Sequence, residues 1–375
     1  MENRIIRGAI LAFAALFGGI VVAACWIIWT RGYSVDFVSF WAAGRMLLDG
    51  AGPAIYDIEA HRVVEQSAVG TVKLMPFPYP PPFGLMVAPF GVPPYAIAFA
   101  LWVATTAALY LLAAGRWMPR LLALAHPSVL VNGFIGQAGF LTSALFMGGL
   151  ALIGRRPLLG GALLGLLVIK PQLAVLLPLA LVAGRHWRAF GGAALSSTAL
   201  LIAALPVVGL DGYAAFLKLA STFAGYVAAG RWPWDELASV YALLSYFAVP
   251  RAIAIGVHLA MAVGTAALVW RAWRGDYPGK VATLAAATLL IPPYLMTYDG
   301  MILALPIAFL LIEARRPQPA IAVWLLSLFP VGAVFGLYGA PNTLPMAALV
   351  ALLAIERVNA STTRPPARTS LPQPA

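Results

Sequence analysis

The chain has 375 residues, of which 62% are apolar and only 10% are charged. Soluble globular domains carry about a quarter charged residues, so this composition excludes a water-soluble fold and predicts an all-α polytopic membrane protein. The formal net charge of +11 is the excess of basic residues that cytoplasmic loops of membrane proteins carry, and we expect no nucleic-acid partner.

The hydrophobic pattern predicts about twelve membrane-spanning helices, several of them short or broken. The first is longer than the hydrophobic core of a cleavable signal peptide, so we interpret it as an uncleaved span. We treat residues 1–358 as one integral-membrane domain and residues 359–375 as a disordered cytoplasmic tail. The expected spans lie near residues 8–30, 95–114, 121–135, 138–154, 157–169, 172–183, 189–208, 252–270, 281–297, 300–312, 318–338 and 343–356.

Basic residues collect on one side of these predicted spans. Sixteen of the 24 lysines and arginines fall on the side of the N-terminus with four acidic residues, whereas the other side has eight basic and nine acidic residues. The positive-inside rule then predicts a multi-pass protein of the plasma (inner) membrane with both termini in the cytoplasm. Under that orientation every unusual polar segment emerges on the extracytoplasmic face.

The first extracytoplasmic loop, residues 31–90, holds five of the thirteen acidic residues. Typical connections between helices are much shorter, so we interpret this loop as the working surface of the protein. Asp36 lies only a few residues after the first span, at the membrane–water boundary. A carboxylate there has the placement of a general base, but an aspartate before an apolar helix is also a good N-cap. Both interpretations stay open.

Two further segments of this loop carry aromatic residues. Residues 37–48 are amphipathic and predict a surface helix with its aromatic residues toward lipid, ended by Gly50; Arg45 on the polar face has a guanidinium suited to a phosphate. The proline-rich segment 77–83 is stiff. Tyr79 within it lines a sugar pocket in one interpretation, and in the other, which we favour, the segment is a scaffold.

Polar residues also stand between apolar spans. Gln137 is costly in a membrane unless it is hydrogen-bonded, so we expect it to face the protein interior or a wet cavity. Lys170, beside a helix-breaking proline, either neutralises a phosphate or extends to the lipid headgroups. Asp299 either binds a hydroxyl or caps the following helix.

A second large extracytoplasmic loop spans residues 209–251. It contains Trp232 and Trp234 beside acidic residues, a composition typical of carbohydrate binding and also of membrane interfaces. The sequence has a single cysteine and no Walker A, dinucleotide-binding or metalloprotease motif, so we expect no metal and no nucleotide cofactor.

Six short patterns, taken in order, resemble glycosyltransferase family 87. They are Asp36-Phe-x-x-Phe-Trp-Ala-Ala-Gly-x-x-Leu-x-x-Gly, Pro-x-x-Tyr56-Asp57, Tyr79-Pro-Pro, Gly136-Gln137, Lys170-Pro-Gln and Pro293-Tyr through Asp299. The resemblance covers roughly residues 10–315 and includes polyprenol-phosphate-mannose-dependent α-mannosyltransferases, whose architecture is similar to the GT-C class.

The resemblance implies an inverting hexosyltransferase with an extracytoplasmic active site. The donor would be a polyprenyl-phosphate sugar, with mannose as the default, and the acceptor a glycolipid or glycan. Asp36 would act as the base, and Lys170, Arg45 and Arg251 would hold the donor phosphate. The pocket residues would be Gln137, Tyr79, Asp299, Trp232 and Trp234.

Two other functions share this composition. A transporter or flippase for lipid-linked sugars would place polar residues near the midplane with access from both sides, whereas here they gather on one face. A non-catalytic assembly protein for such sugars would have almost the same sequence. We therefore expect an enzyme, and keep both alternatives for experiment.

Overall fold

The computed structural model describes residues 35–70, 75–334 and 340–362, with six more residues inside the first predicted span. The rest of that span, near residues 8–30, and the tail beyond residue 362 lie outside the described residues. Residues 359–362, which we assigned to the tail, are helical.

The described part of the chain is built from helices and has no β-strand, and one isolated antiparallel bridge joins Leu237 and Met296. This confirms an all-α protein. The elements are α2 (Phe37–Leu48), η1 (Gly52–Tyr56), α3 (Ile58–Val69), α4 (Pro81–Val87), η2 (Ala88–Gly91), α5 (Tyr95–Ala114), α6 (Arg120–Leu124), α7 (Ser128–Ile135), α8 (Gly139–Leu152), α9 (Pro157–Gly165), η3 (Leu166–Ile169), η4 (Pro171–Leu173), α10 (Leu177–Ala183), α11 (Trp187–Ala228), α12 (Val240–Tyr246), α13 (Arg251–Arg274), α14 (Lys280–Thr288), η5 (Thr297–Leu303), α15 (Ala304–Ala308), η6 (Phe309–Glu313), α16 (Pro317–Val334) and α17 (Leu344–Thr362).

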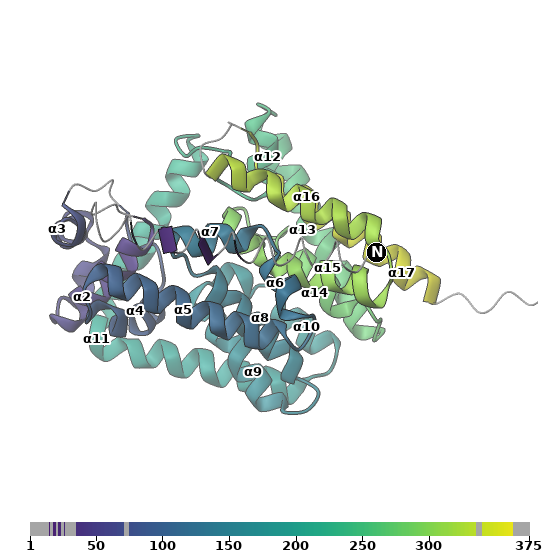
Figure 1. Cartoon of the computed structure of the whole chain (residues 1–375), viewed down its shortest axis with the longest axis horizontal. Coiled ribbons are helices and arrows are strands. Elements are labelled where there is room, and N and C mark those ends of the chain that lie inside the picture. The colour runs from purple at the N-terminus through teal and green to yellow at the C-terminus, as the bar shows by residue number, and fades with distance from the viewer. Residues whose placement is uncertain are drawn as a thin grey trace, which may run out of the picture.

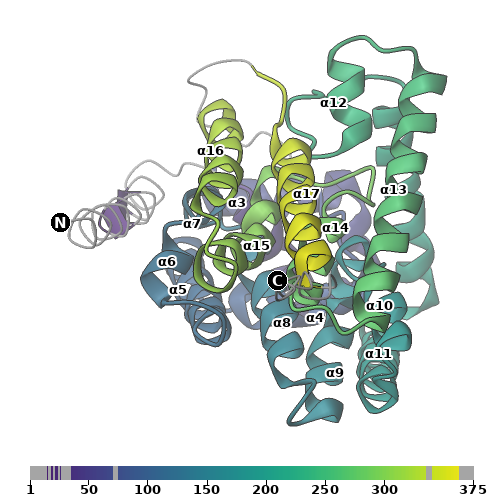
Figure 2. The same ribbon diagram turned by 90° about the vertical axis from the view of Figure 1, so that its right-hand side faces the viewer.

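Four of these helices, α5, α11, α13 and α17, are long and apolar enough to cross a membrane within the described ranges. The other apolar segments are shorter, so the expected count of about twelve spans is not confirmed. Figure 1 shows α2, α3 and α4 gathered at one end of the molecule and α17 at the other. In the turned view, α16 and α17 stand side by side, and they pack against each other (Figure 2).

Helix α2 is buried instead of lying on the surface. Nine of its 12 residues are buried, and the Phe37 and Phe40 rings contact Trp102 of α5 with centroids 6.1 and 5.6 Å away. Phe40 also packs edge-on against Phe83 of α4, 4.9 Å away. The expectation that the aromatic residues of this helix face lipid is therefore wrong, and α2 anchors the first loop in the protein core.

Helix α11 is interrupted by a kink at Gly209, where the predicted span 189–208 ends and the predicted second loop begins. Gly209 has non-helical backbone angles (φ 66°, ψ 179°), and Pro206 lies one turn before it. Since proline removes a backbone donor and glycine tolerates positive φ, the two residues produce a kink at which two helical segments meet. Much of the predicted second loop, residues 209–251, is thus helical, in the second half of α11 and in α12.

Helices α9 and α11 pack at very close range through glycines. A methyl group at Gly161 would overlap the carbonyl oxygen of Ala189, and one at Gly192 would overlap the carbonyl oxygen of Leu158. Helices in membranes gain contact in this way, because small residues let two backbones approach. This pairing fixes α9, and with it the turn that carries Lys170.

We expect Gly192→Ala to lower the free energy of unfolding in detergent by about 1–3 kcal/mol, because the added methyl group forces the two backbones apart. The melting temperature should fall accordingly. Gly191→Ala is the matched control. A methyl group at Gly191 meets nothing within 4 Å, so this variant should be neutral or slightly stabilising, as alanine favours a helix over glycine. Equal melting temperatures for the two variants would contradict the close packing of α9 on α11.

Helix α3 contains two titratable side chains that are removed from water. His61 and Glu65 are 1% and 0% exposed, and Nε2 of His61 lies 3.5 Å from Oε1 of Glu65. The backbone N–H of Met75 donates to the other Glu65 oxygen at 3.2 Å. Burial lowers the pKa of His61 to about 4 and raises the pKa of Glu65 to about 7. Both shifts favour the neutral form of each group.

In the wild-type protein, the effects of these two pKa shifts on the pH dependence of the free energy of unfolding should cancel. Near pH 5.5 the folded state holds one proton, on Glu65, and the unfolded state also holds one, on His61, so folding binds no net proton. In Glu65→Gln only His61 titrates, and its pKa is lower in the folded state than in the unfolded state. As the pH falls from 6.5 toward 4, the unfolded state binds a proton that the folded state does not, so the free energy of unfolding decreases. We expect this variant to lose about 3 kcal/mol over that range.

The measurement is the melting temperature in detergent between pH 4.5 and 7.5. In the wild type we expect this pair to add no pH dependence to the melting temperature over that range. His61→Gln provides the reciprocal control. Only Glu65 then titrates, so stability should fall as the pH rises from 4.5 through 7. Profiles of the same slope in both variants would contradict the assignment of neutral forms.

Candidate active site

Asp36 stands at the N-terminal end of α2. It occupies the N-cap position but makes no side-chain capping hydrogen bond. Instead its Oδ2 accepts a hydrogen bond of 2.9 Å from Nε2 of Gln137. The half-buried Asp36 side chain is therefore bonded to Gln137, and its role as a base stays a prediction.

Gln137 links Asp36 to Tyr79. The Tyr79 hydroxyl donates to Oε1 of Gln137 at 2.8 Å, so the amide nitrogen of Gln137 is turned toward Asp36. Burial raises the pKa of Tyr79 far above its usual range, and the carboxylates of Asp299 and Asp36 add to the shift. Tyr79 therefore remains protonated and keeps the amide in this orientation.

The turn between α7 and α8 places Gln137. Gly136 ends α7 in the left-handed conformation (φ 70°, ψ 29°), which glycine adopts without steric cost. A methyl group at this position would also meet Phe37 Cβ at 2.7 Å and a ring carbon of Phe99 at 2.8 Å. The carbonyl of Gly136 accepts from the Trp102 indole at 2.8 Å, so the turn is fixed to both α2 and α5.

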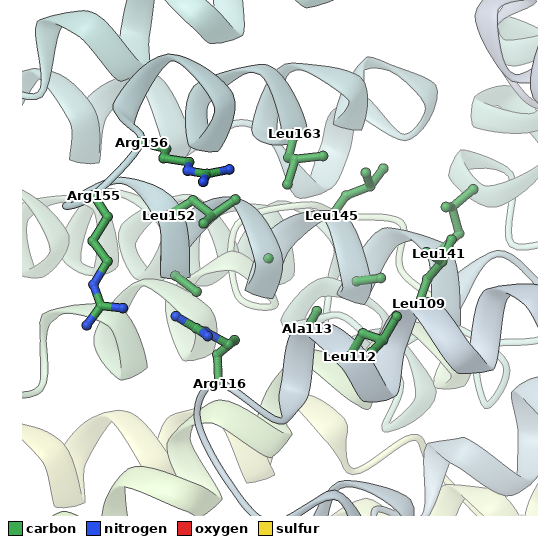
Figure 3. Close-up of a pocket in the computed structure, with 13 residues that line it drawn as sticks. Leu109, Leu112, Ala113, Arg116, Leu141, Leu145, Leu152, Arg155, Arg156 and Leu163 are labelled. Atoms are coloured by element: carbon green, nitrogen blue, oxygen red, sulfur yellow. The ribbon is translucent and has the colours of Figure 1, made fainter.

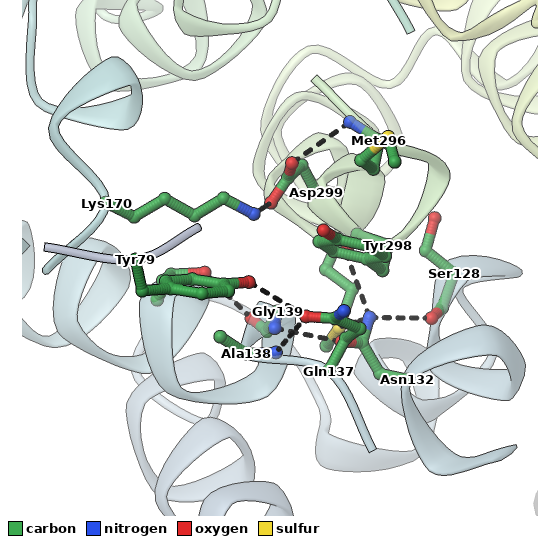
Figure 4. A network of polar contacts seen from close by, with 12 residues as sticks. Tyr79, Ser128, Asn132, Gln137, Ala138, Gly139, Lys170, Met296, Tyr298 and Asp299 are labelled. Carbon is green, nitrogen blue, oxygen red and sulfur yellow. Dashed lines mark hydrogen bonds and ion pairs between the residues drawn. The ribbon is translucent and has the colours of Figure 1, made fainter. Parts of the chain in front are cut away.

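Lys170 and Asp299 form an ion pair inside the protein (Figure 4). Nζ of Lys170 lies 2.5 Å from Oδ1 of Asp299, and the side chains are 3% and 0% exposed. The ammonium also lies 4.4 Å from the centre of the Tyr298 ring and 6.0 Å from that of Tyr79. Lys170 thus does not extend to the surface, which excludes the headgroup interpretation.

The other oxygen of Asp299 caps the short helix that carries it. Oδ2 accepts from the backbone N–H of Met296 at 3.1 Å, so Asp299 caps η5 as one interpretation expected. The hydroxyl-binding interpretation stays a prediction, because the other oxygen binds the ammonium of Lys170. One carboxylate thereby fixes the start of η5 and binds the ammonium of Lys170.

Asn132 holds η5 against the turn of Gln137 (Figure 4). Its side-chain amide is fully buried, donates to the carbonyl of Tyr298 at 2.9 Å, and accepts from the N–H of Gly139 at 2.9 Å. We did not assign Asn132 or Tyr298 to the site from the sequence. The sequence nevertheless contained signals for both residues. Tyr298 lies beside Asp299, which we did select, and Asn132 is a polar residue in an apolar run shortly before Gly136-Gln137.

Five of the nine predicted site residues thus meet in one network, and four lie outside it. Arg45 is half-exposed and pairs with Asp49 on its own helix at 3.0 Å. Arg251 is exposed at the start of α13, within electrostatic range of Tyr294.

Trp232 and Trp234 belong to a satellite cluster. Their rings contact Phe223 and Tyr241, with centroids 5.7 Å apart in each case. The cluster adjoins the network through Leu237, which bridges to Met296. In the described part of the chain, no hydrogen bond or ring contact joins either indole to the residues of the network.

The network brings two carboxylates, Asp36 and Asp299, and the ammonium group of Lys170 close to a shared tyrosine. Tyr79 donates to the partner of Asp36, and its ring lies beside Lys170. A carboxylate in such a position can take a proton from a hydroxyl, and a buried ammonium can stabilise a departing anion. The pair is suited to group transfer between a hydroxyl acceptor and a donor with an anionic leaving group.

Comparison with known proteins supports a transfer reaction. A family model described as glycosyltransferase family 87 matches residues 77–293. The matched range contains Tyr79, Gln137 and Lys170, whereas Asp36 and Asp299 lie outside it. No curated protein and no solved structure was found to match the chain.

Proposed function

Because the chain belongs to glycosyltransferase family 87, and is therefore a membrane glycosyltransferase, we propose that it transfers a hexose from a polyprenyl-phosphate sugar to a glycolipid or glycan acceptor. Mannose is the first sugar to test, because the family resemblance includes polyprenol-phosphate-mannose-dependent enzymes. The proposal places the reaction at the extracytoplasmic face of the plasma membrane, in a GT-C-like bundle with both termini in the cytoplasm.

The reaction we propose is a single displacement with inversion. Asp36 takes the proton of the acceptor hydroxyl, the hydroxyl oxygen attacks the anomeric carbon, and the bond from that carbon to the phosphate oxygen breaks on the opposite face. The leaving polyprenyl phosphate carries the bonding electrons, and the proton on Asp36 is then released to water. Hydrogen-bonding to Gln137 keeps the carboxylate pointing into the site.

Lys170 is the group that receives the leaving phosphate. An ammonium has three N–H donors, and Asp299 takes one of them, so others remain for phosphate oxygens. Because the site is buried, water screens the ammonium poorly, although Asp299 offsets part of its charge, and a phosphate would bind chiefly through the remaining N–H donors. The proposal requires no metal ion, since the ammonium supplies the compensating charge. Arg251 and Arg45 would contact the donor phosphate from outside the network.

The observation that supports this mechanism is the shared position of Tyr79. It contacts both the partner of the proposed base and the proposed phosphate-binding lysine. A donor that places its phosphate on Lys170 would therefore place its sugar close to Asp36. Trp232 and Trp234, in the cluster next to Met296, are assigned to the outer part of an acceptor site.

A transfer assay with reconstituted protein tests the proposal. Proteoliposomes receive radiolabelled polyprenyl-phosphate mannose and a mixed glycolipid acceptor fraction, and a panel of other polyprenyl-phosphate hexoses is run in parallel. We expect label in an extracted glycolipid with one member of the panel, and none with nucleotide sugars as donors. Label that crosses the bilayer without joining an acceptor would establish a flippase. Neither transfer nor translocation across the whole panel would favour a non-catalytic assembly protein.

A further inference from the structure

A groove with a volume of about 550 Å³ lies between α5, α8 and α9. It opens at the surface of the helix bundle, where Leu109 and Leu112 are 44% and 60% exposed. Its size is within the range of small-molecule pockets. Apart from its charged end it is lined by apolar residues, among them Leu109, Leu112, Leu141, Leu145, Leu152 and Leu163.

Three arginines gather at one end of this groove. Figure 3 shows Arg116, Arg155 and Arg156 together there, while most of the leucines extend away from them. All three arginines are exposed, and no acidic residue in the described part of the chain forms an ion pair with them. The groove therefore combines an apolar channel with three guanidinium groups that pair with no acidic residue among those the structure describes.

The arginine end is far from the candidate active site. Helix α8 begins at Gly139, whose N–H is bonded to Asn132 in the network, and ends at Leu152, just before Arg155 and Arg156. A helix of 14 residues is about 21 Å long. A phosphate held by the arginines thus lies at the opposite end of α8 from Gln137, too far for its sugar to reach Asp36.

We propose that this groove binds an anionic phospholipid, with its acyl chains along the leucines and its phosphate on Arg116, Arg155 and Arg156. The argument is charge complementarity: an arginine binds phosphate in a bidentate manner, and basic pockets between membrane helices select anionic headgroups. The apolar channel excludes a free phosphate ion as the natural ligand. The distance from Asp36 excludes the sugar donor. This inference does not depend on the proposed reaction.

Native mass spectrometry of the full-length protein in detergent tests the proposal. The probes are phosphatidylglycerol and phosphatidylcholine with identical acyl chains, titrated separately, and a polyprenyl phosphate. For the wild type we expect at least one phosphatidylglycerol to bind about tenfold or more tightly than phosphatidylcholine. The triple variant Arg116→Gln/Arg155→Gln/Arg156→Gln should lose that preference.

A control triple variant removes the same charge elsewhere. Arg188→Gln/Arg315→Gln/Arg316→Gln changes three exposed arginines outside the groove and should bind phosphatidylglycerol within about twofold of wild type. A second test fills the groove without changing charge. The position of Gly148 has room for a methyl group against Ala113 and Leu163, so Gly148→Leu should weaken phosphatidylglycerol binding by a similar factor to the arginine triple variant.

Three results would overturn the proposal. The first is equal binding of phosphatidylcholine and phosphatidylglycerol to the wild type. The second is an equal loss in both triple variants, which would indicate diffuse electrostatic attraction. The third is a polyprenyl phosphate that competes with phosphatidylglycerol for the same three arginines, which would assign the groove to the donor lipid.

Discussion

Asp36→Asn is expected to lower the rate of sugar transfer by a factor of about 10² to 10⁴, the range that a positioned general base contributes. The amide of this variant has nearly the shape of the carboxylate and keeps an oxygen that can accept from Nε2 of Gln137. It cannot accept a proton at neutral pH. The fold and the network should therefore persist while the reaction fails.

The measurement is a single-turnover transfer rate with the donor identified in the panel, at matched levels of folded protein. Glu59→Gln is the control in the same loop. Glu59 is an exposed carboxylate paired with Arg62 on α3, so its loss should leave the rate within about twofold of wild type. A folded Asp36→Asn variant with the wild-type rate would show that another group takes the proton.

Lys170→Met should impair both stability and transfer. It leaves the Asp299 carboxylate buried without its cation, which costs about 3–5 kcal/mol of stability. Loss of a buried positive charge from the leaving-group site should also reduce transfer by at least about 100-fold. Thermal unfolding in detergent and the single-turnover rate measure the two effects separately.

The double variant Lys170→Met/Asp299→Asn distinguishes structure from chemistry. It removes both charges, and the amide oxygen of the Asp299→Asn substitution can still accept from the backbone N–H of Met296. We expect most of the lost stability to return, because no uncompensated charge remains, while transfer stays as low as in Lys170→Met. Recovery of transfer together with stability would show that Lys170 serves the fold alone.

The sequence was sufficient to select five residues of the network, three of them for one physical reason. A polar side chain in a strongly apolar chain is costly unless it is paired or functional, so Gln137, Lys170 and Asp299 stand out against their surroundings. Asp36, just after the first predicted span, and Tyr79, in the proline-rich segment of the first loop, were selected from the motifs of that loop. The partners could not be predicted, because Lys170 and Asp299 are 129 residues apart and no local pattern relates them.

The position of α2 was the main failure of the sequence interpretation. An amphipathic pattern shows that one face needs apolar surroundings, but it does not say whether lipid or protein provides them. Here Trp102 of α5 and Phe83 of α4 cover the aromatic face. The helix count stays a prediction, because several expected spans correspond to short helices. The expected span 121–135, for example, is divided into α6 and α7 by a break at Ala125–Pro127.

The sequence separations within the network determine when the site can form during synthesis. Asp36 meets Gln137 across 101 residues, and Asn132 meets Tyr298 across 166. A ribosome must therefore insert about four fifths of the chain before Lys170 acquires its counter-ion. Until then a buried ammonium has no partner, and the early helices are incomplete. We therefore expect chains truncated before η5 to lack the assembled network and to be less stable than the full-length protein.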